Sequence, residues 1–390
     1  MPQAQQIRIE RSRDILDDRA GYRLRAEWGH IAVVLSGGHI CELGLACVPA
    51  VNPLWRPHWS TIDPHRYLPG RHQRKYGPAP DGKLLAGLAG HSVSFDHFGP
   101  PSPEEVAAGL TTHGEAPCAA WKRLKTTDSA ALRYGCTLPD AQIEFSRTIA
   151  LDPAHAVIYC EERAENLSRY DRPISWNQHV TFGPPFLESG TTLFDMPATR
   201  SMVCAAGRSD RNGLAADAEF IWPNAPKKLG GHADLRRSGQ GRFEHYTAQL
   251  LDPSQDLSFI SACNPAQGLL VAYAFRRADF PWVGNWEERH HRAAKPWSRR
   301  SFCRGMEFST TPFAIPRRET IDQGPLFGER TYRWLPAKCA LSIRFMIFLF
   351  AVPADFGGVQ RFAIRKGRAK FTEAGPRGRL LAVPVKPFLQ

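Results

Sequence analysis

The sequence lacks the features that mark membrane, secreted and repeat proteins. Its longest apolar stretch near the C-terminus, 345–352, is much shorter than the roughly 20 residues that cross a bilayer. The first 18 residues are polar and charged, without the apolar segment of a secretory signal. No internal repeat and no low-complexity linker divides the chain. We therefore expect a cytoplasmic protein with no membrane partner.

Cysteine motifs are missing as well. None of the nine cysteines stands in a C-x-x-C pair, and the closest two, Cys41 and Cys47, lie in an apolar, strand-like stretch. This pattern excludes a zinc-ligand motif and a disulfide framework, and scattered thiols are typical of a reducing compartment. His290-His291 is no metal motif either, because adjacent residues on a strand point to opposite faces. We expect neither a metal nor another cofactor.

Long helices are not expected, because Gly and Pro, 32 each, are spread along the whole chain and helix interiors tolerate neither well. A hydrophobic fraction of 43% is ample for a core. Strand patterns occur at 31–35 before a Gly-Gly turn, at 143–151 and 157–163 around an Asp-Pro turn, at 269–275 and at 340–350. The only plausible helix is Ser102 to Leu110. The sequence predicts one large all-β unit.

Positive charge is concentrated at the C-terminus. The formal net charge is +12, and residues 361–390 hold eight Lys or Arg against one acid, Glu373. A basic tail could contact nucleic acid or an acidic membrane, whereas a solvated terminal strand is the commoner case. Because no basic patch with interleaved aromatics recurs elsewhere, we predict no nucleic-acid partner. We expect a domain over 20–372, a polar N-terminal segment over 1–19 and a basic tail over 373–390.

Three short segments carry groups suited to acid–base chemistry. They contain His113 (GLTTHGEAP), His179 (SWNQHVTFGPPF) and Glu307 (RGMEFSTTPF), each beside a strand-like run and a Gly or Pro turn. A lone His or Glu in such a place is more often structural than catalytic. Four consecutive residues, Trp176 to His179, combine an aromatic with three hydrogen-bonding groups, which is expensive to bury unless a partner uses them.

The long segment from Pro49 to Gly90 is rich in Pro, His, Arg and Trp, and loops of this length inside a domain are usually functional or disordered. Its aromatics, including Trp55 and Trp59, favour an ordered loop that covers a site. Two further stretches, 223–241 and 281–304, are predicted to be loops of the same kind.

At these residues the chain resembles the aldose 1-epimerase, or galactose mutarotase-like, superfamily. The segments SGGHICELGL, HGEAP, SWNQHVTFG and GMEFSTTPF are similar to that superfamily's motifs in their order, over residues 20 to 372. The resemblance is closest to a bacterial aldose-epimerase-like branch. It implies a large twisted antiparallel β-supersandwich with a sugar site on its concave face and no cofactor.

The resemblance also implies roles. Glu307 would remove the proton of the anomeric hydroxyl, His179 would protonate the ring oxygen, and His113 would hold a hydroxyl or the developing charge. The implied sugar-binding set continues with Asn177, Gln178, Arg71, Trp282 and Trp286. The alternative for the two tryptophans is that they pack at the edge between the sheets. The superfamily's binding arginine has no clean counterpart, and Arg71 is the candidate. Its aspartate is not placed, since Asp234 and Glu244 both lie in the right region.

Three functions stay open at this point. The first is an aldose 1-epimerase-like isomerase, including a variant in which clustered arginines hold a sugar phosphate. The second is a non-catalytic carbohydrate-binding protein on the same fold. The third is a polysaccharide lyase-like enzyme, for which the positive charge leaves room. The sequence does not indicate an oligomeric state.

Overall fold

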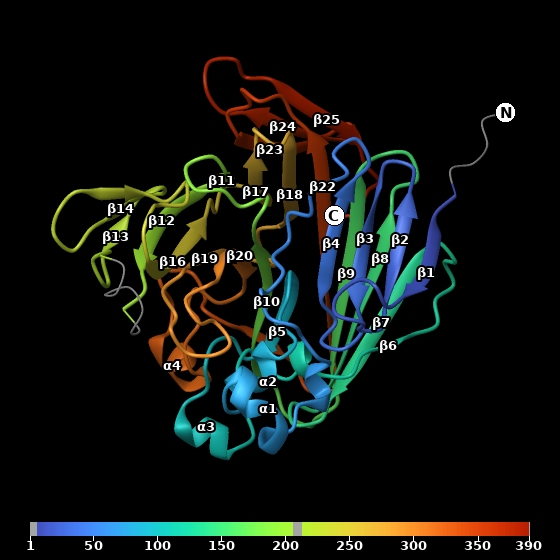
Figure 1. Ribbon diagram of the computed structural model, residues 1–390, viewed down its shortest axis with the longest axis vertical. Coiled ribbons are helices and arrows are strands. Elements are labelled where there is room, and N and C mark those ends of the chain that lie inside the picture. Colours follow the sequence, from blue (N-terminus) through green and yellow to red (C-terminus); the bar gives the residue numbers. More distant parts are fainter. Residues whose placement is uncertain (1–5, 206–212, 390) are drawn as a thin grey trace.

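The computed structural model describes residues 6–205 and 213–389, and within these the chain forms two large antiparallel sheets packed face to face (Figure 1). The larger sheet has twelve strands in these residues. Its order is β1 (Arg8–Ser12), β2 (Gly21–Ala26), β3 (Gly29–Val34), β4 (Ile40–Leu45), β5 (His91–Asp96), β10 (Arg172–Phe182), β20 (Phe302–Ser309), β19 (Trp282–Arg289), β16 (Phe243–Leu251), β12 (Ala198–Val203) and β13 (Glu219–Phe220), and β21 (Arg333–Leu335) pairs with β10.

The second sheet has eight strands over the same described ranges. Its order is β11 (Leu193–Asp195), β17 (Leu257–Asn264), β18 (Leu269–Arg276), β22 (Ala340–Ala351), β9 (Val157–Asn166), β8 (Ile143–Leu151), β7 (Ala131–Leu138) and β6 (Lys122–Arg123). Two smaller sheets are formed by β14 (Asn224–Pro226) with β15 (His232–Asp234), and by β23 (Val359–Arg365), β24 (Arg368–Glu373) and β25 (Leu380–Pro384). The helices are short: α1 (Pro69–Tyr76), α2 (Asp81–Leu85), α3 (Pro103–Ala107) and α4 (Arg317–Gln323), with 3₁₀ turns η1 (Pro64–Arg66) and η2 (Ala116–Cys118).

The main core fills the space between the two large sheets. Alternate residues of β10, such as Trp176 and Val180, are fully buried in it, because successive side chains on a strand point to opposite faces. Across the gap Phe275 of β18 stacks on Phe308 of β20, with 4.4 Å between the ring centroids. The predicted all-β supersandwich is confirmed.

Local patterns predicted several elements at close to their observed bounds. The hairpin of β8 and β9 extends from Ile143 to Asn166, with the expected turn between its strands. Strands β3, β18 and β22 lie where apolar runs indicated strands. Helix α3 begins with the expected cap, in which Ser102 and Glu105 bond each other's backbone N–H groups. The expectation of a single helix is wrong, because α1, α2 and α4 are also present among the described residues.

Both ends of the described chain are part of sheets. At the start, β1 pairs with β2, while residues 1–5 of the expected polar segment lie outside the described residues. At the other end the boundary expected after residue 372 falls inside β24, and the expected tail contains β25, which pairs with β24. Val383 packs there into an apolar cluster with Phe371, so alternating apolar residues hold this basic segment to the sandwich.

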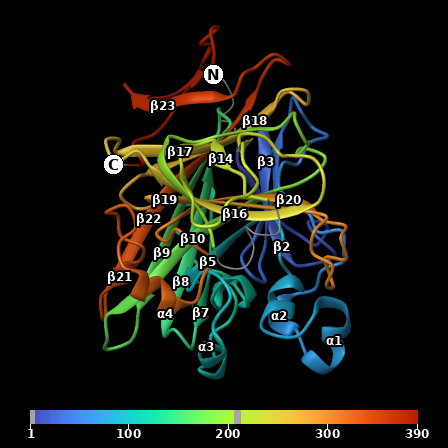
Figure 2. The same ribbon diagram turned by 90° about the vertical axis from the view of Figure 1, so that its left-hand side faces the viewer.

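The helices gather at one end of the molecule and the β23–β25 sheet lies at the opposite end, as both views show (Figures 1 and 2). Helices α1 and α2 come from the long 49–90 segment and contact each other. Within the described residues no helix is both long and apolar enough to cross a membrane. At the helical end, residues of α1 and α2 lie over the face of the larger sheet that turns away from the core. The candidate site lies between them.

Candidate active site

A cross-strand pair forms the centre of the site. Strands β10 and β20 are antiparallel neighbours, and their register places His179 directly opposite Glu307. Both side chains lie on the sheet face that turns away from the core, since Val180 and Phe308 on either strand are buried in the core. The His179 Nε2 and Glu307 Oε1 atoms are 3.3 Å apart. Strand pairing therefore brings an imidazole and a carboxylate from distant segments into contact.

Two glycines make room for the carboxylate. A Cβ atom on Gly305 would lie 2.5 Å from Glu307 Oε1, because the two residues share a face of β20. On the neighbouring strand Gly284 is the register partner of Glu307. A Cβ there would lie 1.9 Å from the Tyr246 hydroxyl oxygen and 3.3 Å from Glu307 Oε2. Any larger residue at either position would displace a group of the site.

His179 is oriented by Thr181, two residues along the same face of β10. The Thr181 hydroxyl lies 3.0 Å from Nδ1, and donation of its proton to Nδ1 leaves the ring proton on Nε2, toward Glu307. Burial lowers the pKa of His179 to about 4, and the positive charge of Arg292 acts in the same direction. The imidazole is therefore neutral at pH 7 in the empty site.

His113 completes a group of three. Its backbone is left-handed, with φ +63°, and the following Gly114 has φ +75° and lies against the Phe95 carbonyl. The His113 Nδ1 atom accepts the backbone N–H of Gly99 at 3.2 Å, so its Nε2 carries the proton. The ring stacks on Phe98 and lies 5.3 Å, centroid to centroid, from His179. The three segments singled out in the sequence thus meet.

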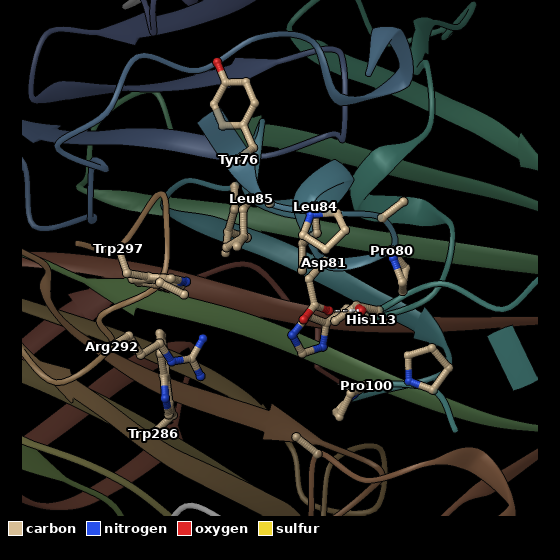
Figure 3. A pocket seen from close by; sticks show the side chains of 18 of the residues that line it. Tyr76, Pro80, Asp81, Leu84, Leu85, Pro100, His113, Trp286, Arg292 and Trp297 are labelled. Atoms are coloured by element: carbon tan, nitrogen blue, oxygen red, sulfur yellow. Dashed lines mark hydrogen bonds between the residues drawn. The ribbon is translucent and has the colours of Figure 1, made fainter. Parts of the chain in front are cut away.

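These residues open into a cavity of about 850 Å³, within the size range of pockets that enclose small-molecule ligands. Figure 3 shows the helical segment on one side of it and Trp286, Arg292 and Trp297 on another. The 49–90 segment supplies part of the wall, as the sequence indicated, and it does so with Tyr76, Asp81, Leu84 and Leu85. The expectation of a loop over all of 281–304 is wrong, because β19 occupies Trp282–Arg289 and β20 begins at Phe302. The loop between these strands supplies Arg292, Lys295 and Trp297.

Arg292 is one of the cavity residues that the sequence analysis did not identify. Its guanidinium lies over Trp286 and Trp297, at 5.3 and 4.8 Å from the ring centroids, and its Nε donates to Glu244 at 3.1 Å. Glu288 accepts the backbone N–H of Arg292 at 2.9 Å, and burial raises the pKa of Glu288 to about 7. The only signal in the sequence was an arginine in a Trp-rich loop.

The other predicted binding residues differ in position. Trp286 lines the cavity, with its ring 6.0 Å from that of His179. Trp282 does not line it, because the indole is fully buried and donates to the Arg330 carbonyl at 2.7 Å. Arg71 is exposed on α1 and is not part of the cavity wall. Arg292 is thus the arginine that faces the cavity.

Asn177 and Gln178 lie on opposite faces of β10. Asn177 shares the face of His179 but is completely buried and does not line the cavity. Gln178 points into the core, where its Oε1 lies 2.9 Å from His91 Nε2 and its Nε2 bonds Glu162. Placing Gln178 in the sugar site was wrong, because the period of the strand turns it away from His179.

The two candidates for the superfamily's aspartate, Asp234 and Glu244, lie in different places. Asp234 is exposed on β15, whereas Glu244 on β16 lines the cavity and forms an ion pair with Arg292. Asp81 of α2 is a further acid in the wall and accepts the Thr112 hydroxyl proton at 2.5 Å. In the part of the chain that the structure describes, no three His, Cys, Asp or Glu side chains are grouped to hold a metal ion.

Comparison with known proteins shows what the fold is. No family model and no curated protein matches the sequence. A proposed aldose 1-epimerase from Klebsiella pneumoniae is similar in structure, with a TM-score of 0.60 and 14% identity over 89% of this chain and 88% of that one. A galactose mutarotase-like protein from Clostridium acetobutylicum has a TM-score of 0.56 and 13% identity over 89% of this chain and 99% of that one.

A galactose mutarotase related enzyme from Lactobacillus acidophilus has a TM-score of 0.53 and 13% identity over 85% of this chain and 98% of that one. At these identities the likeness is one of fold. The chain has the galactose mutarotase-like fold that the sequence motifs indicated.

Proposed function

We propose that this chain interconverts the anomers of a sugar by opening and closing its ring. The observation that carries the proposal is the His179–Glu307 pair, 3.3 Å apart at the base of a cavity of about 850 Å³. With a carboxylate next to an imidazole, one group can take a proton from a sugar while the other donates a proton to a neighbouring oxygen of the same sugar.

The reaction balances with these two groups. Glu307 takes the proton of the anomeric hydroxyl, the C1–O5 bond breaks as the C1 carbonyl forms, and His179 gives a proton to O5. The aldehyde then turns by rotation about the C1–C2 bond, and reversal of the same proton transfers closes the ring on its other face. Both side chains return to their starting states, so no other reactant is needed.

The low pKa of His179 sets the cost of the acid step. With a pKa of about 4 in the empty cavity, the imidazole carries its second proton in about one molecule in a thousand at pH 7, a cost of about 4 kcal/mol. The ionised Glu307 next to it stabilises the imidazolium once a sugar excludes water from the pair. This cost is modest beside the 8 kcal/mol or more by which enzymes usually lower barriers.

The rest of the cavity suits a sugar. The faces of Trp286 and Trp297 give apolar surface of the kind that the C–H groups of a pyranose cover. The Gly99 N–H on Nδ1 fixes the His113 proton on Nε2, the nitrogen that would donate to the ring oxygen or to the developing carbonyl oxygen of a bound sugar. Arg292 supplies further donors to hydroxyl groups.

Polarimetry tests the proposal. Anomerisation of several free aldoses is followed with the parent, Glu307→Gln, His179→Asn and, as a matched control, His232→Asn, which is exposed on β15. We expect the first two variants to lose about 10²- to 10⁴-fold in rate and the control to match the parent. Sugar binding without any acceleration by the parent would instead identify a carbohydrate-binding protein, and unsaturated products from polyuronates would identify a lyase.

A further inference from the structure

A second hollow, of about 440 Å³, lies next to the cavity and is basic. Arg74 and Lys75 reach it from the last turn of α1, and Lys295 and Arg300 reach it from the 290–301 loop. Lys295 also lines the main cavity, so the two spaces are neighbours. No acidic residue is part of the hollow's lining.

These four cations are not neutralised by the protein. Within residues 6–205 and 213–389 no carboxylate lies within ion-pair distance of any of the four cations. Many other arginines in these ranges do pair with a carboxylate. Two segments more than two hundred residues apart thus bring like charges around one depression, where each raises the free energy of the others. An anion in the hollow would remove that repulsion.

The two spaces differ in charge. Three acids, Glu307, Glu244 and Asp81, line the main cavity together with two cations, Arg292 and Lys295, whereas only cations line the hollow. The cavity is therefore the less favourable of the two places for an anion. The two spaces share a wall of packed aromatic rings and the Lys295 side chain: Trp59 of the hollow lies 5.3 Å from Trp297, which lies 5.9 Å from Trp286 in the cavity wall. An uncharged ring is thus favoured in the cavity and a negative group in the hollow.

We propose that the sugar bound in the cavity carries an oxyanion group, a phosphate, sulfate or carboxylate, that lies in the basic hollow between Lys295, Arg300 and the end of α1. This inference rests on the proposed function, because it names the substrate class of the same site. The guanidinium and ammonium groups hold the oxyanion by charge-assisted hydrogen bonds, and Trp59 shields one side of it.

The test is a set of titrations followed by the fluorescence of the tryptophans that line both spaces. Glucose, glucose 6-phosphate and glucuronate are each titrated into the parent and into Arg74→Ala/Arg300→Ala, which removes two cations that line the hollow and not the main cavity. Arg71→Ala is the matched control, because it removes a cation from the same helix as Arg74 at a position outside the hollow. Each titration is repeated at 1 M salt, where the Debye length falls to about 3 Å.

We expect the anionic sugars to bind about three- to tenfold more tightly than glucose at low salt, since each exposed charge pair contributes only weakly. The double variant and 1 M salt should each remove this preference and leave glucose binding unchanged, and Arg71→Ala should change nothing. Comparison of the phosphate with the carboxylate identifies which oxyanion is preferred.

Equal affinity for glucose and the anionic sugars in the parent would overturn the anion inference and leave the anomerase proposal intact. An anion preference that survives in Arg74→Ala/Arg300→Ala would also overturn it. Failure of every sugar to bind would overturn the proposed function itself. In that case inorganic phosphate is titrated, and binding that is lost in Arg74→Ala/Arg300→Ala would show that the hollow is an anion site independent of sugars.

Discussion

Replacing Gly305 by alanine removes no chemical group from the site and yet should impair it. Gly305 stands two residues before Glu307 on the same face of β20, with Thr181 and Trp286 as its register partners. An added Cβ would lie 2.5 Å from Glu307 Oε1, and the next nearest atoms also belong to the Glu307 side chain, at 3.3 Å. The atom that must give way is the end of a flexible side chain, so the variant should fold.

The size of the effect follows from this contact. Ordinary van der Waals contacts of a Cβ begin at 3.4 Å, so the carboxylate oxygen must move by at least 3.4 − 2.5 = 0.9 Å. A displacement of about 1 Å in a catalytic group can cost about 10²-fold in rate. We therefore expect kcat/KM for anomerisation to fall by about two orders of magnitude, while the temperature of unfolding changes little.

The assay compares Gly305→Ala with Gly70→Ala by polarimetry and by thermal unfolding. Gly70 lies in α1 with open space around its added Cβ, so alanine there should leave activity unchanged and stabilise the helix by up to about 1 kcal/mol. A Gly305→Ala protein that is folded and as active as the parent would refute the reasoning that Glu307 acts from the position opposite His179.

Three further predictions concern the pH dependence of activity, the pH dependence of stability and the role of Arg292. Because His179 must be protonated to act as the acid and burial lowers its pKa to about 4, kcat/KM should fall about tenfold for each pH unit above neutrality; a rate that rises with pH would exclude that role. Burial lowers the pKa of His39 and of His245 to about 3, so the unfolded state binds more protons below pH 6.5. As the pH is lowered below 6.5, the free energy of unfolding should therefore decrease by about 1.4 kcal/mol per pH unit for each histidine. Urea melts at pH 7 and pH 5 that coincide would contradict this. Arg292→Lys should weaken sugar binding about tenfold relative to Arg299→Lys, an exposed neighbour, because lysine cannot keep both the Glu244 pair and the stack on two indoles; equal affinities in fluorescence titrations would contradict it.

Local sequence patterns account for much of the sandwich. Alternating apolar residues predicted the β8–β9 hairpin, because a half-buried strand requires that alternation whatever it pairs with. The capping residues of α3 predicted its start for a similar reason. Helices α1 and α2 were not predicted, since their proline- and glycine-containing sequences have weak helix propensity and pack by tertiary contacts of Tyr76, Leu84 and Leu85.

The same alternation could have separated two neighbouring residues of β10. Once 172–182 is taken as a strand, Gln178 and His179 must face opposite sides. Applied to β10, the alternation would have placed Gln178 in the core. The same argument does not apply to His290-His291, because β19 ends at Arg289 and both histidines lie in the loop that follows. What local pattern could not indicate is that Asn177, on the same face as His179, lies too deep to reach the cavity.

The sequence by itself determined which residue types are present for acid–base chemistry, and that His113, His179 and Glu307 lie beside strands. Only the tertiary structure decided that β10 pairs with β20 in the register that sets His179 opposite Glu307, and that Arg292 and Lys295, rather than Arg71, face the cavity. The physical reason is that strand register and loop position depend on hydrogen bonds and packing between distant segments, and these leave no periodic signal in either segment alone.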